Sequence, residues 1–377
     1  MITGKKPSEC VPWLKPAHQI THMSDSHQNP DQGYLPLFHT IRGEVVESIH
    51  YGAIAIVDPS GKLFAWYGNP EAVSFLRSSA KPFQALPLVE MGGLETFQIT
   101  EKELAVTCAS HSGTDQHLKT IHGLQQKIGI SEKDLLCCTH QPFDFSTRAL
   151  LRDRGEEPSP NHHNCSGKHS GMLAQAKLLH ADLDNYPEIE HPIQQQIRSV
   201  IAEICCIEPS RLQEGRDGCS VPAFAMPLYH AAWGWARLIK PDGFSEKRKN
   251  ACKTITSAMA AHPFLIAGPD RLDTRLMKIA AGKIISKAGA EAFQSAGILE
   301  NAIYPGSPAL GIALKISDGD QGKRARRTVL IEILNQLEVL SADQMKDLAD
   351  LGPILTNRNQ CDLVTGVAKP CFQLQYS

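Results

Sequence analysis

Ser78 and Lys81 lie three positions apart in the sequence Arg-Ser-Ser-Ala-Lys-Pro. Residues at this spacing share one face of a helix, so this hydroxyl and this amine can meet without a histidine. These two side chains are the minimum for a serine nucleophile with a lysine general base. Because serine and lysine are common residues, the spacing gains weight only if other reactive groups converge on it.

Pro82 limits where this pair can lie in its helix. Proline is tolerated only in the first turn, where its missing N–H costs no hydrogen bond. The residues from Ser78 to about Val89 are therefore predicted to form a helix, with Ser78 at its N-terminus and Lys81 one turn in. Free backbone N–H groups and the helix dipole at that end favour an oxyanion near Ser78.

Four further segments carry residues that could take part in chemistry. A cluster of small and hydroxyl residues spans 107–113, and Ser110 is its best candidate. Residues 164–169 and 217–220 are glycine-containing turns that each carry a cysteine, the kind of loop that presents a site on a rigid body. Late in the chain, Lys287 stands before Ala-Gly at the end of a strand-like run.

A lysine acts as a base only when its amine is neutral, and the ordinary lysine pKa is about 10.4. Burial and a neighbouring cation both lower that pKa. We expect Lys287 or a metal ion to supply the positive charge near Lys81.

Composition excludes several classes of protein. The chain has 377 residues, of which 42% are hydrophobic and 21% are charged, and its net charge is −2. Such a chain is long enough for a large core or two lobes. The near-zero charge predicts no nucleic-acid or anionic-membrane partner. The sequence contains no run of about 18 apolar residues, so no membrane span is expected.

The eleven cysteines are an odd number and include two adjacent pairs, a poor layout for a disulfide framework. Most are predicted to be small buried hydrophobes in a reducing compartment, and one or two to be metal ligands. The N-terminus also lacks an apolar signal core, so we expect a cytoplasmic protein.

The order of predicted elements indicates an α+β fold. Residues 1–35 read as an N-terminal extension, and residues 36–377 as a single catalytic domain. The predicted strands are 51–57, 62–67, 283–287 and 311–316; the predicted helices are 78–89, 115–128, 169–180, 191–206, 245–260, 270–281 and 325–340. Strands at both ends with helices between them predict one antiparallel sheet flanked by helices, and a mainly helical lobe.

The reactive segments follow an order that is similar to known enzymes. Ser-x-x-Lys, a serine loop and Lys-x-Gly loosely match the three boxes of the penicillin-recognising enzymes. The fuller set is Arg77–Pro82, Ala109–Gly113, Asn164–His169, Asp217–Cys219 and Lys287–Glu291. Together these motifs resemble the L-asparaginases of the Rhizobium etli inducible type, a zinc-containing Ser-Lys family of β-lactamase-like fold. The resemblance runs from about Tyr51 to Ile316.

The resemblance implies a role for individual residues. Ser78 would be the nucleophile and Lys81 its base. Ser110 and Lys287 would form a second Ser-Lys pair that relays protons. The substrate-binding positions that it implies are Arg77, Asn164, His169 and Asp217. The zinc ligands that it implies are Cys165, Lys168 and Cys219, with water as a fourth. One position departs from the family, which usually has a cysteine where Asp273 stands.

Simpler interpretations of the same residues stay open. Two thiolates are ordinary zinc ligands, whereas a lysine must first lose its proton, so the residues alone favour His163 or His169 as the third ligand. Cys165 and Cys219 could instead be buried thiols. Ser110 could cap a helix that begins near Thr114. Lys287 could be a charge at a strand edge, and Asp217 a turn residue paired with Arg216.

The leading hypothesis is an L-asparaginase that converts L-asparagine to L-aspartate and ammonia. Ser78 would attack the side-chain amide, and water would then hydrolyse the β-aspartyl ester. Arg77 and Asp217 could hold the substrate's α-carboxylate and α-amino groups, and the resemblance implies a homodimer. The alternatives are a serine-type glutaminase or β-lactamase-like hydrolase, a hydrolase whose centre is zinc, and a non-catalytic, zinc-stabilised amino-acid-binding protein.

Overall fold

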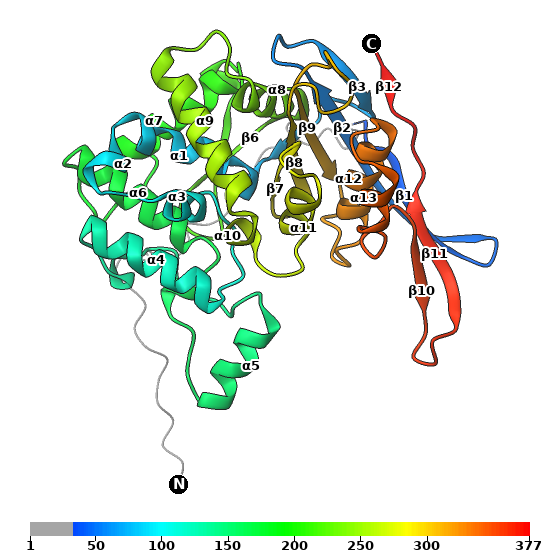
Figure 1. The fold of residues 1–377 in the computed structure, drawn as a ribbon, viewed down its shortest axis with the longest axis horizontal. Helices are drawn as coiled ribbons and strands as arrows, with labels where there is room; N and C mark the ends of the chain where they lie inside the picture. The colour runs from blue at the N-terminus through cyan, green and yellow to red at the C-terminus, as the bar shows by residue number, and fades with distance from the viewer. Residues whose placement is uncertain (1–32) are drawn as a thin grey trace, which may run out of the picture. The chain divides into compact units, whose positions relative to one another are not determined.

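Strands from two distant parts of the chain form one antiparallel sheet (Figure 1). The computed structural model describes residues 33–377, so the predicted extension, residues 1–35, lies outside the described residues except for its last three. The strands are β1 (Leu35–Arg42), β2 (Val45–Val57), β3 (Leu63–Tyr67), β7 (Ile284–Ala288), β8 (Phe293–Ile298), β9 (Leu310–Ile316), β10 (Leu355–Arg358), β11 (Val364–Pro370) and β12 (Gln375–Tyr376). Their order is β10-β11-β1-β2-β9-β8-β7, with β3 beside β2 and β12 beside β3.

The chain between β3 and β7 is mainly helical. A 3₁₀ turn, Arg77–Ala80, leads into α1 (Lys81–Glu90). The other helices here are α2 (Gly93–Thr96), α3 (Glu101–Thr107), α4 (Asp115–Ile128), α5 (Phe145–Arg154), α6 (Ser166–Leu178), α7 (Pro192–Ile204), α8 (Leu228–Ile239), α9 (Glu246–Ala261), α10 (Pro263–Ala267) and α11 (Leu272–Ile279). A small antiparallel sheet joins β4 (Val73–Phe75), β6 (Pro222–Pro227) and β5 (Gln213–Arg216). After β9 come α12 (Ala325–Gln336) and α13 (Ala342–Lys346).

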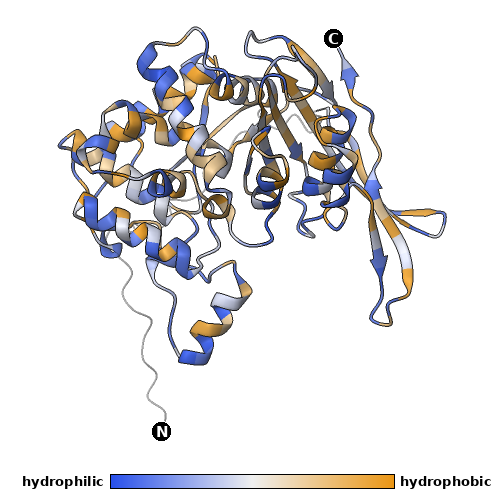
Figure 2. Cartoon of the chain, in the orientation of Figure 1, coloured by the Kyte–Doolittle hydropathy of each residue, from blue (hydrophilic) through white to orange (hydrophobic). Residues whose placement is uncertain are grey.

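Helices cover both faces of the large sheet because its central strands are apolar on both sides. Successive side chains of a strand point to opposite faces. Ala53, Ala55 and Val57 of β2 belong to the core shared with α8, whereas Ile54 and Ile56 belong to a second core shared with α12. In Figure 2 the central strands are accordingly mostly hydrophobic.

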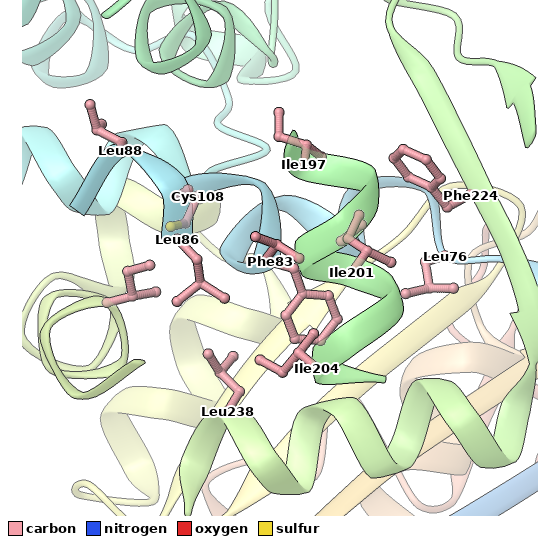
Figure 3. Close-up of a cluster of buried hydrophobic side chains, with 14 of the residues drawn as sticks. Leu76, Phe83, Leu86, Leu88, Cys108, Ile197, Ile201, Ile204, Phe224 and Leu238 are labelled. Atoms are coloured by element: carbon pink, nitrogen blue, oxygen red, sulfur yellow. The ribbon is translucent and has the colours of Figure 1, made fainter. Parts of the chain in front are cut away.

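The helical lobe has its own packed core. Ile197, Ile201 and Ile204 of α7 recur at helical spacing and are fully buried. Figure 3 shows them beside Phe83 of α1 and Leu238 of α8. This core fixes α1, and therefore the segment that carries Ser78 and Lys81, against the rest of the lobe.

The predicted fold class, α+β with an antiparallel sheet flanked by helices and a helical lobe, is confirmed. The helix predicted from Ser78 is wrong at its start: residues 77–80 form the 3₁₀ turn, and α1 begins at Lys81 with Pro82 in its first turn. Within residues 33–377, no helix is both long and apolar enough to cross a membrane.

Candidate active site

Two buried lysines converge on one serine hydroxyl. Lys81 Nζ donates to Ser110 Oγ over 3.0 Å, and Lys287 Nζ does so over 2.8 Å. The lysines are at most 1% exposed, and Ser110 is 6% exposed. Backbone carbonyls accept further hydrogen bonds, from Lys81 at Ala109 (2.5 Å) and from Lys287 at Ala288 (2.8 Å). Side chains from α1, from the loop after α3 and from β7 thus form one polar cluster.

The cluster holds one lysine that can be neutral near pH 7. Burial, and next the positive charge of Lys81, lower the pKa of Lys287 to about 7. Ser110 therefore lies between two amines of which one readily gives up its proton. A hydroxyl in that position can accept a proton from one amine while it donates to the other, so the arrangement can move protons across the cluster.

A close backbone approach places β7 beside the segment of Ser78. A Cβ added at Gly289 would lie 2.6 Å from the carbonyl oxygen of Leu76, so only glycine fits there. The Ser79 hydroxyl donates to the carbonyl of Lys287 over 2.7 Å. This contact gives the Lys-x-Gly motif a physical reason: the glycine lets the strand that carries Lys287 reach the turn that carries Ser78.

Ser78 itself is half-buried in the 3₁₀ turn. The preceding residue, Arg77, has a φ of 50°, a left-handed conformation that strains a non-glycine residue and is often found at functional sites. Among the described residues, the Ser78 hydroxyl makes no hydrogen bond, and Lys81 contacts Ser110 instead. The structure therefore joins Lys81, Ser110 and Lys287, but does not join Ser78 to Lys81 by a hydrogen bond.

Ser110 does not cap a helix in the structure. The N-cap of α4 is Thr114, whose side chain contacts His117. Ser110 instead has its backbone N–H bonded to the carbonyl of Ile266 and its side chain bonded to both lysines.

An ion pair stands at the partly exposed side of the site. Arg77 Nη2 and Asp217 Oδ1 are 3.1 Å apart, with their side chains 24% and 18% exposed. Burial opposes the charge of Asp217, but Lys168 and Arg77 hold its pKa below the ordinary value. The pairing with Arg216 that was an alternative is wrong, because Arg216 pairs with Glu188.

The predicted zinc ligands also lie together. Lys168 Nζ is 2.9 Å from the sulfur of Cys219, and the sulfur of Cys165 is 3.3 Å from Asn164 Oδ1. The neighbouring Cys219, together with the charges of Lys81 and Lys168, lowers the pKa of Cys165 despite its burial. Residues 33–377 hold no group of three or more His, Cys, Asp and Glu side chains arranged for a metal. A set of two thiols and one amine nevertheless fits zinc in donor chemistry.

His169 and Asn164 border this thiol cluster. The imidazole of His169 is fully buried; its Nδ1 lies 2.6 Å from the Tyr186 hydroxyl, and its Nε2 has no hydrogen-bond partner in the described part of the chain. Asn164 Oδ1 is 3.2 Å from Nε2 of His140. A buried ring nitrogen without a partner is a place where a bound group can form a hydrogen bond.

Sequence reasoning missed Ser79 and Tyr186. Ser79 is part of the same motif as Ser78, but nothing in the spacing shows which of two adjacent serines anchors β7 and which is half-buried. Tyr186 lies in a segment between α6 and α7 with no motif, so no signal in the sequence connects it with His169.

The family of the chain follows from a match over most of its length. Residues 38–368 match the family model described as L-asparaginase II, so the chain belongs to the L-asparaginase II family. The protein is an amidohydrolase of the asparaginase and glutaminase kind. No curated protein matches the sequence.

Several solved glutaminase structures are similar in fold at low identity. A probable glutaminase from Bacillus subtilis has 12% identity and a TM-score of 0.38, over 77% of this chain and 89% of that one. The native form of a protein called Mglu has 13% identity and a TM-score of 0.41, over 78% of this chain and 66% of that one. With TM-scores this low, the assignment rests on the family match.

The depressed pKa of Lys287 predicts an unusual effect on stability. The unfolded chain protonates this lysine below about pH 10, whereas the folded protein does so only below about pH 7. Between these values the unfolded state binds the extra proton, so stability rises with pH. Lys287→Met is therefore expected to stabilise the protein by roughly 2–4 kcal/mol at pH 7, and by less at about pH 9.5.

Urea unfolding at both pH values measures this effect. Lys102→Met, at an exposed position of α3, is the matched control and should change stability little at either pH. A Lys287→Met protein that is less stable than the parent at pH 7 would show that Lys287 is not held with a lowered pKa.

Proposed function

We propose that the protein is an L-asparaginase that hydrolyses L-asparagine to L-aspartate and ammonia through a Ser-Lys acyl-enzyme. The family match supports an amidohydrolase. The observation that carries the mechanism is the buried cluster in which Lys81 and Lys287 share the hydroxyl of Ser110. Such a cluster supplies a neutral amine at neutral pH, which a serine nucleophile needs.

Ser78 is the proposed nucleophile. Ser78 is half-buried. Its hydroxyl makes no hydrogen bond to any other described residue. In the first step Ser78 Oγ bonds to the side-chain amide carbon, and its proton is passed through Lys81 and Ser110 to the neutral amine of Lys287. The amide C–N bond then breaks as the leaving nitrogen takes a proton back from the cluster and departs as ammonia.

The second half of the reaction uses the same groups. The acyl group is now a β-aspartyl ester of Ser78, and the lysines have returned to the state with one neutral amine. That amine accepts a proton from a water molecule, which bonds to the ester carbon. The ester C–O bond breaks, Ser78 regains its proton, and L-aspartate is released.

The ion pair of Arg77 and Asp217 suits a zwitterionic substrate. An α-carboxylate can bind the guanidinium of Arg77, and an α-amino group can bind the carboxylate of Asp217. Both side chains are partly exposed, so a substrate can reach them. Asn164 and His169 are proposed to complete the pocket, and the unpartnered Nε2 of His169 supports that role.

Zinc is proposed to bind Cys165, Lys168 and Cys219. Two thiols and an amine lie together there, and all three side chains are at most 5% exposed. Bound zinc would fix the turn that carries Cys219, and so would help to hold Asp217, two residues earlier, in place for the substrate. The homodimer and the cytoplasmic location that the sequence indicated stay predictions.

The nucleophile assignment predicts the loss of activity and of a covalent adduct. Ser78→Ala should reduce ammonia release from L-asparagine by at least about 1,000-fold, because no acyl-enzyme can form. An asparagine analogue with a diazoketone in place of the amide should label Ser78, as located by peptide mass spectrometry. Ser60→Ala, in an exposed turn, is the control and should keep full activity.

Three outcomes would change this assignment. Labelling of Ser110 in place of Ser78 would move the nucleophile to the hydroxyl between the lysines. Faster ammonia release from L-glutamine than from L-asparagine would make the protein a serine-type glutaminase. Binding of L-asparagine without ammonia release would favour an amino-acid-binding protein.

Metal analysis tests the proposed zinc site. The parent protein is expected to carry about one zinc per chain, and Cys165→Ala is expected to lose most of it, because a thiolate supplies much of the affinity. Cys252→Ala, which removes a buried thiol of α9 outside the site, should keep the metal. An unchanged zinc content of Cys165→Ala would contradict the ligand assignment.

A further inference from the structure

Asp273 is a buried carboxylate beside the strand that carries Lys287. It lies in the first turn of α11 and is 2% exposed. Its Oδ1 accepts hydrogen bonds from Ser286 Oγ (2.7 Å) and Gln294 Nε2 (3.0 Å), and its Oδ2 accepts one from the backbone N–H of Ala288 (2.8 Å). Two of these donors belong to the residues immediately before and after Lys287.

These contacts hold an edge strand. Within residues 33–377 the large sheet ends at β7, so no described strand fixes the outer side of β7. The Asp273 carboxylate takes that place: it bonds the backbone at Ala288 and the side chain at Ser286. Gln294 of β8 holds the carboxylate in turn, and its own Oε1 accepts a hydrogen bond from the partly buried Arg326.

Asp273 also bears a negative charge near two cations, the buried Lys287 and the partly buried Arg326. Burial disfavours that charge, but Lys287 and next Arg326 hold the pKa of Asp273 below the ordinary value, with help from its hydrogen bonds. Among the described residues, its oxygens form no ion pair within 4.0 Å, and Lys287 uses its own hydrogen bonds on Ser110 and Ala288. The carboxylate therefore acts on Lys287 through the strand and through its field.

We propose that Asp273 is a positioning residue for the reaction: it fixes β7 on both sides of Lys287 and supplies the buried negative charge that faces the Lys81–Ser110–Lys287 cluster. This inference rests on the proposed function. It predicts that Asp273 affects turnover and its pH dependence, and that it has little effect on the binding of L-asparagine.

The direction of the pH effect follows from the charges around Lys287. Lys81 of α1 and Arg271, which precedes α11, lower its pKa, whereas Asp273 of α11 and Cys165, which precedes α6, raise it. Cys108, after α3, also faces this lysine. Removal of the Asp273 charge should lower the pKa of Lys287, so the amine stays neutral in more acidic solution.

The test compares the pH dependence of kcat/KM for L-asparagine in the parent and in Asp273→Asn. The acid limb of the variant should move to lower pH by about half a unit or more. At the optimum kcat should fall by about 10-fold while KM stays within about threefold, because the groups that bind substrate are untouched. Asp273→Glu, which restores the charge, should return the limb towards its original position.

Asp320→Asn is the matched control. Asp320 is 3% exposed and accepts two backbone N–H groups at the start of α12, whereas Asp273 accepts one on β7; Asp320 touches none of Lys81, Ser110 and Lys287. Asp320→Asn should leave the acid limb of the kcat/KM profile at its original pH. Asp273→Ser, which keeps one acceptor oxygen without the charge, serves as a second variant and should show the same shift as Asp273→Asn.

An unshifted limb in folded Asp273→Asn or Asp273→Ser would overturn the proposal, whatever the loss of stability. Failure of both variants to fold would overturn it as well, because Asp273 would then serve folding alone. Absence of ammonia release from L-asparagine by the parent protein would instead be a failure of the proposed function, so the two failures are distinguishable.

Discussion

The rest of the site depends on the burial of two lysine side chains around a single hydroxyl. A buried ammonium lacks the solvation that water gives it, and a second ammonium nearby repels it. Lys81 and Lys287 meet both conditions, and the outcome is a Lys287 whose pKa is about 7. Within residues 33–377 neither lysine forms an ion pair, so these costs are not cancelled and the amine of Lys287 can exchange protons. The packed cores on both faces of the sheet supply the stability that offsets this cost.

The architecture explains how distant segments meet at that hydroxyl. The core of the helical lobe holds α1, and the sheet holds β7 at its edge. Gly289 permits the close backbone approach between them, and Ser79 ties the turn to the strand. The thiol cluster of Cys165 and Cys219 lies beside Asp217, so the proposed metal and the proposed substrate ligands share one region. Each reactive side chain is therefore positioned by a helix or strand that is held in place by its own packing.

Much of this could be predicted from the sequence, and the exceptions have physical causes. The helix at 115–128 shows a clear apolar period and was placed correctly to the residue. Helix α8 was missed because most of its residues are buried and Arg237 is its one charged residue, so few polar positions mark its outer side. Strands β10 and β11 were missed because many of their side chains are exposed and carry no alternating pattern.

The roles of the site residues stay predictions, and their contacts differ from those expected in one informative way. Three-residue spacing suggested that Lys81 would contact Ser78, but a long lysine side chain takes its partner from tertiary packing, and here that partner is Ser110. The surroundings of Asp273 could not be read from any motif, because Ser286, Gln294 and Arg326 come together only when α11 and α12 pack on the sheet. Spacing identifies groups that can react, whereas their hydrogen-bond partners depend on the assembled fold.

The most direct test of this account is a measurement of the protonation of Lys287 itself. Nitrogen NMR of protein labelled at the lysine side-chain nitrogen, followed from about pH 5 to about pH 10, would report it, and the resonance would be assigned by its loss in Lys287→Met. The account predicts a midpoint near pH 7. A Lys287 that keeps its proton to above about pH 9 would contradict the claim that the buried cluster provides a neutral amine.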